Sequence, residues 1–296
     1  MGELESKVAF VTGGSSGIGL GIARACHQAG MKVAISYRTP EHLRQAEAYF
    51  QSRPHDFHAI RLEVTDRRAM SEAAVEIEEK FGQVQLLVNN AGIGIKTPIS
   101  QASFEEWDLA IDVNLRGVIN GVGVFVPRML AAGQPSHVVS TASMSGLFAA
   151  GKAGVYITTK YAIVGMMEAL RADLAPHGIG VSAFCPGAVQ SHIADWKRQG
   201  HGSASGPKPV GMDALECGER VLRGVRENAL FILTHPEFRE GLEQRCRALL
   251  SSFHDEDGQA PGERLLVERE LLKSEIYEQE LARLARCHSR PESETP

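Results

Sequence analysis

Short apolar runs alternate with helical patterns over the first 185 residues of this 296-residue chain. Each run is rich in β-branched residues, as buried strands are, and successive runs begin about 25 to 53 residues apart. A strand, a helix and a second strand form a right-handed crossover, and such crossovers build a parallel sheet with helices on both faces. We therefore predict a doubly wound α/β fold. The expected strands cover residues 7–12, 32–37, 57–64, 84–89, 137–141 and 179–185, and the expected helices residues 18–29, 41–51, 66–81, 104–130 in two pieces, and 156–175.

The pattern changes after residue 186. Residues 199–211 carry four glycines and two prolines, which predicts a flexible loop. A helix over 214–226, a short strand over 231–233 and a helical stretch over 236–253 follow, and then a polar linker over 255–262 and a charged helix over 263–286. We expect a Rossmann-type catalytic domain over residues 1–250 and a charged helical C-terminal extension over residues 251–296.

Composition narrows the range of partners. A net charge of −5 gives no electrostatic reason to expect nucleic acid. The most apolar stretch, residues 117–133, is interrupted by Asn120, Pro127 and Arg128, so we expect no membrane span. The acidic start lacks the features of a secretory signal, and neither the five cysteines nor the eleven histidines show metal-binding spacing. We therefore expect a cytoplasmic protein with reduced thiols and no metal.

A glycine-rich turn, residues 12–19, lies between the first strand and the first helix. Glycines allow positive φ and close backbone approach, and free N–H groups at the start of the helix favour a pyrophosphate. The strand–turn–helix context predicts a dinucleotide site, although a tight structural turn would also be rich in glycine.

The end of the second strand bears on which dinucleotide binds. An acidic residue there would hydrogen-bond the ribose 2′-hydroxyl and repel a 2′-phosphate. This chain has Ser36, Tyr37 and Arg38 instead, with no carboxylate before Glu41. A guanidinium suits a phosphate, so NADP is favoured and NAD is the alternative. A solvated surface arginine is the other interpretation of Arg38.

Tyr156 and Lys160 stand one helical turn apart at the start of a predicted helix. A nearby ammonium favours the phenolate and should lower the tyrosine pKa, so that the phenol can exchange a proton with an alcohol or carbonyl oxygen. Ser143 follows the strand over 137–141 and is expected at the carboxyl edge of the sheet, where α/β folds bind ligands.

Together these motifs resemble those of the short-chain dehydrogenases/reductases of the non-extended branch. The resemblance runs from about residue 6 to residue 235. It includes Thr12-Gly-x-x-x-Gly17-Ile18-Gly19, the Asn89-Asn90-Ala91-Gly92 segment and the Pro186-Gly187 turn. It implies a catalytic tetrad of Asn114, Ser143, Tyr156 and Lys160.

The resemblance implies a role for each member of the tetrad. Tyr156 would be the acid/base, Ser143 would orient the substrate oxygen, and Asn114 would hold a water in a proton relay. Lys160 would bind the nicotinamide ribose, and the backbone of Val189 would meet the nicotinamide carboxamide. The implied cofactor-binding residues are Gly13, Ser15, Ser16, Gly17, Ile18, Gly19, Tyr37, Arg38, Glu63, Val64, Asn90, Ala91, Gly92, Tyr156, Lys160, Pro186, Gly187, Val189 and Ser191.

Two positions depart from the family pattern. Glu63 stands where the family usually has an aspartate beside the adenine, and Ser191 stands where a threonine often contacts the cofactor. The first change puts the adenine contact in doubt, and the second is mild.

The chain is also similar to bacterial short-chain dehydrogenases that act on bulky aryl secondary alcohols and ketones, including Cα-dehydrogenases of lignin-derived dimers. This similarity implies a hydride transfer between a nicotinamide cofactor and such an alcohol or ketone, and Arg38 favours NADP(H) as that cofactor. An acyl-carrier ketoreductase and a non-catalytic NADP-binding sensor are the alternatives.

The resemblance also implies a homodimer or homotetramer that pairs helices over 114–130 and 156–175. The candidate substrate residues are Ile95, Ser145, Leu147, Phe148, His192, Ile193 and Trp196.

Overall fold

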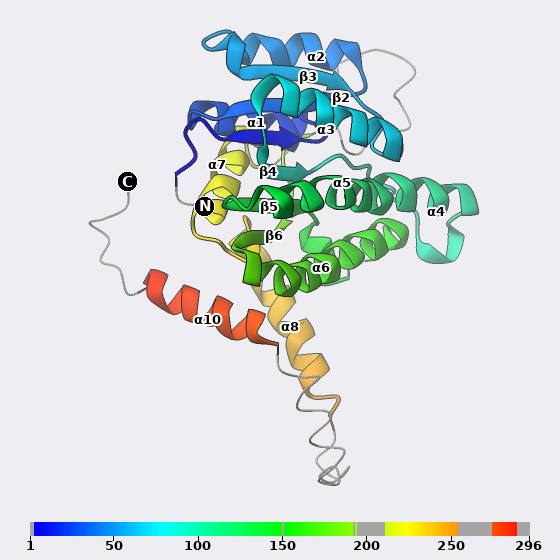
Figure 1. Cartoon of the computed structure of the whole chain (residues 1–296). Helices are drawn as coiled ribbons and strands as arrows, with labels where there is room; N and C mark the ends of the chain where they lie inside the picture. The colour runs from blue at the N-terminus through cyan, green and yellow to red at the C-terminus, as the bar shows by residue number, and fades with distance from the viewer. Residues whose placement is uncertain (1–2, 150, 192, 194–210, 254–273, 289–296) are drawn as a thin grey trace.

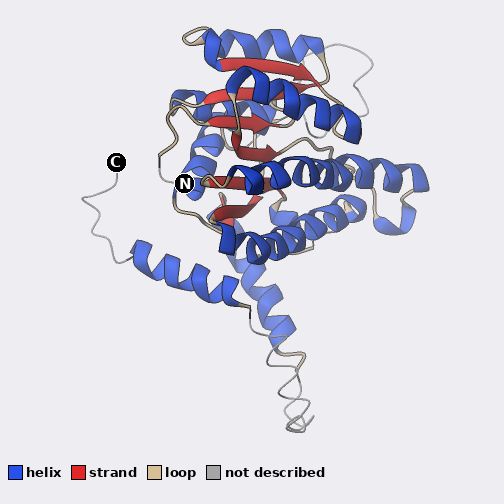
Figure 2. Cartoon of the chain, in the orientation of Figure 1, coloured by secondary structure: helices blue, strands red, loops and turns tan. Residues whose placement is uncertain are grey.

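A computed structural model describes residues 3–149, 151–191, 193, 211–253 and 274–288. Its centre is a parallel sheet with the strand order β3-β2-β1-β4-β5-β6-β7 (Figures 1 and 2). Every neighbouring pair of these strands runs parallel, as the alternation of strands and helices predicted. The strands are β1 (Val8–Val11), β2 (Lys32–Tyr37), β3 (Phe57–Arg61), β4 (Val84–Asn89), β5 (Ser136–Thr141), β6 (Ile179–Cys185) and β7 (Phe231–Leu233).

Helices cover both faces of the sheet, which confirms the doubly wound Rossmann-type fold (Figure 1). Helices α1 and α7 pack side by side on one face, and α3, α5 and α6 cover the other. The helices are α1 (Gly17–Gln28), α2 (Pro40–Glu47), α3 (Arg67–Phe81), α4 (Phe104–Ala110), α5 (Gly117–Ala132), α6 (Gly154–Leu174), α7 (Ala214–Arg226), α8 (Arg239–Leu250) and α10 (Glu275–His288).

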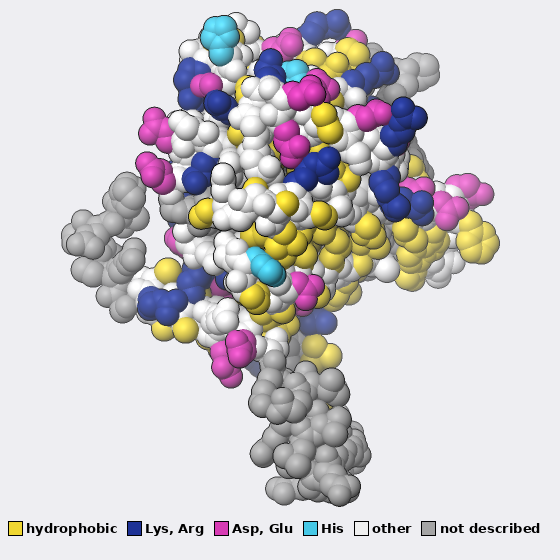
Figure 3. Space-filling view, in the orientation of Figure 1, with side chains coloured by type: hydrophobic (Ala, Val, Ile, Leu, Met, Phe, Trp, Pro, Cys, Tyr) yellow, Lys and Arg dark blue, Asp and Glu magenta, His cyan; other side chains and the backbone are white. Residues whose placement is uncertain are grey.

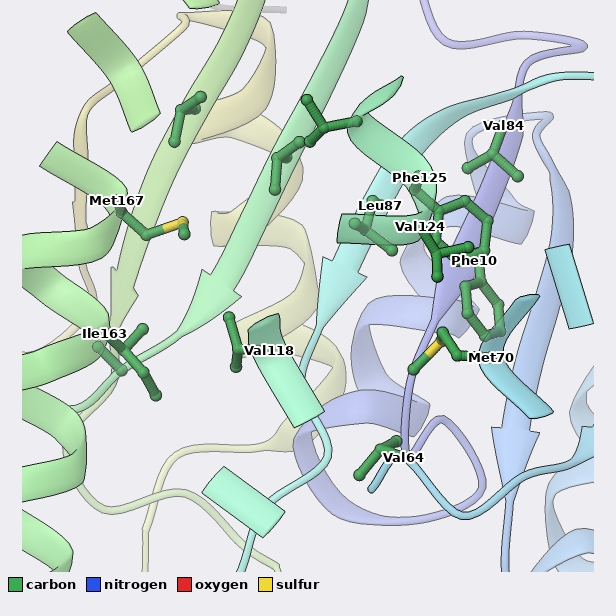
Figure 4. Packing of buried hydrophobic residues seen from close by; sticks show 14 of the residues in the cluster. Phe10, Val64, Met70, Val84, Leu87, Val118, Val124, Phe125, Ile163 and Met167 are labelled. Atoms are coloured by element: carbon green, nitrogen blue, oxygen red, sulfur yellow. The ribbon is translucent and has the colours of Figure 1, made fainter. Parts of the chain in front are cut away.

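The core lies in two layers, one on each side of the sheet. In the layer under α3 and α5, Phe10 of β1 meets Phe125 of α5 with ring centroids 5.2 Å apart (Figure 4). Met70 of α3 and Leu87 of β4 are fully buried in the same layer. Burial of such side chains contributes about 1.5 to 3 kcal/mol each, so this layer holds the crossover helices on the sheet.

Most predicted bounds agree with the structure, and β2, β4, β6, β7 and α7 match the predicted residues. Strand β3 is shorter than predicted and ends at Arg61, where its pairing with Tyr37 of β2 ends. The predicted strand residues 62–64 leave the sheet, because β2, the strand beside β3, ends at Tyr37 and offers them no strand residue to pair with.

Residues 104–132 form a continuous helical run in which a π-helical turn, η4 (Ile111–Arg116), joins α4 to α5. The sequence predicted two helical pieces there, and the π-turn is the junction between them. This run is long and apolar enough to cross a membrane by length and composition. However, 56% of its most apolar window is buried inside the structure, where it packs in the core.

Past β7 the chain forms a short 3-10 helix, η8 (Pro236–Phe238), and then α8. The predicted loop over 199–211 and linker over 255–262 lie almost wholly outside the described residues. Helix α10 is the described part of the predicted C-terminal helix, and it packs beside α6 (Figure 1). The carboxylate of Glu280 accepts a hydrogen bond of 3.1 Å from the backbone N–H of Leu230, so α10 is tied to the start of β7. The division of the chain at residue 250 stays a prediction.

Candidate active site

A cleft of about 500 Å³ opens at the carboxyl edge of the sheet. The strand order reverses between β1 and β4, and ligands of doubly wound folds bind at that point. The predicted residues lining the cleft come from the β1–α1 turn, the ends of β2 to β6 and the first turns of α6. They are Gly13, Ser15, Ser16, Gly17, Ile18, Tyr37, Arg38, Glu63, Val64, Asn90, Ala91, Gly92, Ser143, Tyr156, Lys160, Pro186, Gly187, Val189, Ser191 and Ile193.

The glycine-rich turn has the geometry that a pyrophosphate needs. Gly13 and Gly17 have φ of 63° and 51°, a region that favours glycine. A side chain on Gly13 would lie 3.0 Å from Cα of Ala91 and would fill this part of the cleft. Ser16 precedes α1 without forming a side-chain cap, so the first N–H groups of α1 are available to a ligand. These residues fit the pyrophosphate of a dinucleotide.

Gly19, the last glycine of the motif, does not line the cleft. A side chain there would collide with the carbonyl of Gly13 and the amide of Asn90. Its role is therefore to let the start of α1 approach the turn, rather than to touch a ligand.

Thr12 and Asn90 connect the ends of β1 and β4. The hydroxyl of Thr12 accepts hydrogen bonds from the backbone N–H groups of Asn90 (2.8 Å) and Ala91 (3.1 Å). The Asn90 amide donates to the carbonyl of Thr12 at 3.1 Å and accepts from the hydroxyl of Thr141 at 3.3 Å. This network holds the cleft floor across three strands. This role of Thr12 was not predicted from the sequence, although its place between a strand end and the glycines is a usable signal.

Ser143, Tyr156 and Lys160 converge in the cleft. The Tyr156 phenol hydrogen-bonds the side chain of Ser143, and the ammonium of Lys160 lies 5.5 Å from the centroid of the Tyr156 ring. Lys160 is buried and donates a 2.7 Å hydrogen bond to the carbonyl of Thr141. One helical turn of α6 and the end of β5 thus bring a phenol, a hydroxyl and an ammonium to one place.

Burial has the largest effect on the pKa values of Tyr156 and Lys160. Burial raises the pKa of Tyr156, and its hydrogen bond to Ser143 offsets this in part. Burial also lowers the pKa of Lys160 to about 8. The sequence led us to expect that Lys160 lowers the tyrosine pKa, but the pKa of Tyr156 in the protein without cofactor is raised. The reason is that burial disfavours the charged phenolate more than its neighbours stabilise it, and the ammonium of Lys160 is held by the carbonyl of Thr141.

Asn114 lies behind the cleft in the π-helical turn η4 and is 1% exposed. Its side-chain oxygen accepts from the N–H of Ile93 at 2.8 Å, and its amide donates to the Ile93 carbonyl at 3.0 Å. The amide also donates to the hydroxyl of Thr159 at 3.3 Å, so Asn114 links the segment after β4 to α6. The expected water relay through Asn114 stays a prediction.

Arg38 and Glu63 face each other at the adenine end of the cleft. Their side chains form an ion pair of 3.7 Å and are 53% and 45% exposed. Ser36, in contrast, is buried, and its hydroxyl accepts a 2.9 Å hydrogen bond from the N–H of Gly13. Ser36 therefore supports the turn, and Arg38 is the cation at the end of β2 that a ligand can meet.

The candidate substrate residues divide into three groups. Ile193 lines the cleft, and its carbonyl accepts from the N–H of Gly94 at 3.0 Å. Ser145, Leu147, Phe148 and Ile95 do not line it. The backbone of Ser145 donates to Ser143 Oγ, Leu147 packs on the core, Phe148 lies 5.8 Å from the ring of Phe238, and Ile95 is itself in the core. His192 and Trp196 lie outside the described residues.

Several cleft residues were not predicted from the sequence. They have no motif of their own and follow strand ends or line the rim, where only the fold brings them together. They are Ser36, Thr39, His42, Leu62, Ile93, Lys96, Val113, Thr141, Ala142 and Ala188. Among the described parts of the chain, no group of three or more His, Cys, Asp or Glu side chains is placed to hold a metal ion.

Comparison with known proteins agrees with this geometry. The sequence profile of the short chain dehydrogenase family matches residues 7–201. A C alpha-dehydrogenase from Sphingobium sp. is 36% identical over 284 residues, which is 90% of this chain and 93% of that protein. The structure of a short-chain dehydrogenase from Novosphingobium aromaticivorans is 33% identical, with a TM-score of 0.83, and the match covers 96% of this chain and 99% of that one.

A third similar protein was solved with a ligand. It is a short chain dehydrogenase/reductase from Burkholderia phymatum in complex with NAD, 28% identical to this chain with a TM-score of 0.79. The match covers 88% of this chain and 100% of that one.

Proposed function

The chain belongs to the short-chain dehydrogenase family, and on this premise we propose that it transfers a hydride reversibly between NADP(H) and a bulky, hydrophobic or aryl secondary alcohol or ketone. The observation that carries the proposal is the meeting of Ser143, Tyr156 and Lys160 beside the glycine-rich turn. A phenol and a hydroxyl that share a hydrogen bond can both reach one substrate oxygen.

When bound, the nicotinamide cofactor supplies or accepts the hydride. In the reducing direction, the Tyr156 hydroxyl gives its proton to the oxygen of the former carbonyl, and the Ser143 hydroxyl donates a hydrogen bond that stabilises that oxygen as charge develops. The raised pKa of Tyr156 keeps its proton on the phenol at neutral pH, as a general acid requires. Oxidation reverses these steps, and the phenolate then takes the proton from the alcohol.

Lys160 supports the tyrosine in two ways. Its pKa of about 8 leaves the ammonium as the main form at neutral pH, beside the ring on which negative charge forms. Its position also suits a hydrogen bond to the nicotinamide ribose, which the family resemblance implies. Asn114 holds the backbone of Ile93 and the hydroxyl of Thr159, and so supports both cleft walls.

Arg38 is the basis for choosing NADP over NAD. It is the cation at the end of β2 that lines the cleft, and a guanidinium binds a phosphate bidentately. The opposing argument is its ion pair with Glu63, whose carboxylate would repel a 2′-phosphate unless the pair opens. NAD is therefore the alternative cofactor.

The substrate class rests on similarity and on the cleft. The C alpha-dehydrogenase similarity extends over nine-tenths of the chain, beyond the residues that the family profile matches. Ile93, Val113 and Ile193 give the cleft apolar wall surface, which suits a hydrophobic or aryl group. We further propose that the protein acts in the cytoplasm as a homodimer or homotetramer.

The experiment is a panel of aryl and alkyl ketones, assayed with NADPH and with NADH by loss of nicotinamide absorbance. Turnover of bulky aryl ketones with a preference for NADPH supports the proposal. Coenzyme binding without turnover of any ketone or alcohol would favour the non-catalytic sensor. Turnover restricted to carrier-bound acyl ketones would favour the acyl-carrier ketoreductase.

A further inference from the structure

The loop after β6 lines the cleft, and by the family resemblance its Val189 backbone would meet the nicotinamide. Residues Pro186, Gly187, Ala188 and Val189 all line the cleft. One side of this loop is held by the backbone of Met212, whose N–H donates to the Ala188 carbonyl at 2.9 Å and whose carbonyl accepts from Gln190 at 3.0 Å. The other side rests on a side chain from a different element.

That side chain is His235, which follows β7. Strand β7 pairs with the end of β6, with Leu233 beside Cys185, so the residues after both strands emerge together at the carboxyl edge. The imidazole Nδ1 lies 3.0 Å from the N–H of Gly187, and Nε2 lies 3.0 Å from the carbonyl of Ala188. One ring thus contacts two successive residues of the loop.

The partners of the ring fix its protonation pattern. A backbone N–H can only donate, so Nδ1 must carry a lone pair toward Gly187, and the hydroxyl of Thr234, 2.7 Å from the same nitrogen, then donates to it as well. A carbonyl can only accept, so Nε2 must carry the hydrogen toward Ala188. His235 is therefore the neutral Nε2–H tautomer. Among the described residues, the N–H of Gly187 has only Nδ1 as acceptor, whereas the carbonyl of Ala188 also has Met212.

The fit between ring and loop is close. His235 is 8% exposed, and its ring lies 6.1 Å from that of Phe238. A side chain on Gly187 would lie 2.7 Å from His235 Cγ and from the Phe238 ring, so glycine lets the loop lie directly on these two rings. His235 itself does not line the cleft and lies beyond the residues that the family profile matches.

We propose that His235 is a positioning residue for hydride transfer: by holding Gly187 and Ala188 with both ring nitrogens, it fixes the backbone of Val189 against the nicotinamide. This inference rests on the proposed function. The glycine-rich turn for the pyrophosphate lies between β1 and α1, and Arg38 and Glu63 at the adenine end follow β2 and β3, so none of these residues belongs to this loop. Loss of His235 should therefore disturb the orientation of the nicotinamide more than the affinity for the coenzyme.

The test compares three substitutions that remove different parts of the ring's function. His235→Asn keeps an acceptor at the position of Nδ1, His235→Gln keeps a donor at the position of Nε2, and His235→Phe keeps neither. His177→Asn, at an exposed histidine after α6, is the matched control. Three quantities are measured for each protein: the Kd of the preferred coenzyme by fluorescence, the single-turnover hydride-transfer rate, and the primary isotope effect with 4-deuterated coenzyme.

We expect His235→Phe to lower the hydride-transfer rate about 100-fold, because a small misplacement of the reacting atoms has that effect. Its Kd should stay within about threefold of the wild-type value, and its isotope effect on steady-state turnover should rise as hydride transfer becomes rate-limiting. His235→Asn should recover most of the rate, since it satisfies the N–H of Gly187. His235→Gln should stay slow, and His177→Asn should match the wild type.

The inference would be overturned if His235→Phe transferred hydride at the wild-type rate and showed the wild-type isotope effect. The inference would also be overturned if the Asn and Gln variants lost hydride-transfer rate equally and in proportion to their loss of thermal stability, because the role of His235 would then be structural. If His235→Phe does not fold, the difference between the Asn and Gln variants decides the question. A wild-type protein that transfers no hydride overturns the proposed function and this inference with it, whereas an active wild type leaves only the inference at stake.

Discussion

At the scale of single residues, the proposed chemistry depends on a proton that few side chains in the cleft can supply to the substrate oxygen. Tyr156 and Ser143 share a hydrogen bond, and Lys160 is committed to the carbonyl of Thr141. The phenol is therefore the group best placed to exchange a proton with a substrate oxygen. Arg38, paired with Glu63, is the corresponding single-residue determinant at the adenine end.

The substitution Tyr156→Phe removes the proton and keeps the ring beside Lys160. We expect turnover to fall by about 1,000-fold or more, in the upper range for loss of a general acid, with coenzyme binding nearly unchanged. Steady-state rates and coenzyme fluorescence measure the two effects. Tyr161→Phe, the same change at a residue of α6 outside the cleft, is the control and should retain full activity. Substantial activity in Tyr156→Phe would refute the acid/base role.

The substitution Arg38→Asp reverses the charge at the end of β2. A carboxylate there repels a 2′-phosphate and can accept a hydrogen bond from the 2′-hydroxyl of NAD. We expect the ratio of kcat/KM for NADPH to that for NADH to fall about 100-fold, the equivalent of roughly 2.7 kcal/mol. Arg61→Asp carries the same charge change at the end of the neighbouring β3, outside the cleft, and should leave the ratio near the wild-type value. An unchanged ratio in Arg38→Asp would reject the argument for NADP.

At the scale of elements, the structure shows how two irregular features serve the cleft. The π-helical turn η4 holds Asn114 where its amide can bind the backbone of Ile93, and π-turns are frequent at functional sites. The early end of β3 releases residues 62–64 toward the cleft. Away from these two features, β5 contains His137, whose side chain is fully buried beside Ser182 of β6.

His137 should make the stability of the fold depend on pH. The hydroxyl of Ser182 donates to the carbonyl of Ala229, so Nε2 of His137 donates to Ser182 at 2.8 Å, while Nδ1 has no partner in the described structure. Burial lowers the pKa of His137 from 6.5 to about 3. Between these values the unfolded chain binds a proton that the folded chain does not, so stability is full above pH 6.5 and falls on acidification toward pH 3.

His137→Gln removes this titration and keeps a donor for Ser182. We expect the free energy of unfolding of the variant to fall less steeply on acidification than that of the wild type. Between roughly pH 4 and 6 the two slopes should differ by about 1.4 kcal/mol per pH unit. Urea unfolding at several pH values gives the slopes. His55→Gln, at an exposed histidine, should keep the wild-type slope. Parallel curves for wild type and His137→Gln would show that His137 does not titrate as its burial requires.

At the scale of the whole molecule, apolar side chains gather over α4 and α5 on one face (Figure 3). Phe104, Leu109, Ile111, Ile119 and Leu130 are all more than a third exposed there. An apolar face of this kind commonly marks a contact with another protein chain. It coincides with the helix over 114–130 that the family resemblance implies for pairing between subunits.

The charge-introducing substitution Ile119→Glu tests this face. We expect the wild type to be a dimer or tetramer, and the variant to dissociate toward smaller species because an unpaired carboxylate would be buried in the interface. Light scattering after size-exclusion chromatography gives the masses. Val75→Glu, at a similarly exposed residue of α3 and outside the helical run over residues 104–132, should keep the wild-type mass. A monomeric wild type, or an Ile119→Glu variant of unchanged mass, would contradict the prediction.

Sequence alone determined the layers of the fold and most of the cleft residues. A buried strand, an amphipathic helix, a glycine-rich turn and a Tyr156–Lys160 pair are each encoded within a few consecutive residues, because backbone preference and side-chain periodicity are local properties. The alternation of strand and helix then limits the topology, since crossovers are right-handed. This is why the sheet and the residues around the turn could be predicted.

Only the tertiary structure decided which distant groups meet. His235 contacts Gly187 across 48 residues, Asn90 meets Thr12 across 78, and Phe148 packs on Phe238 rather than lining the cleft. The pKa of Tyr156 likewise follows from burial, which the spacing to Lys160 does not reveal. Such contacts depend on how packed elements approach one another, and desolvation depends on all surrounding atoms, so neither is written in a short stretch of sequence.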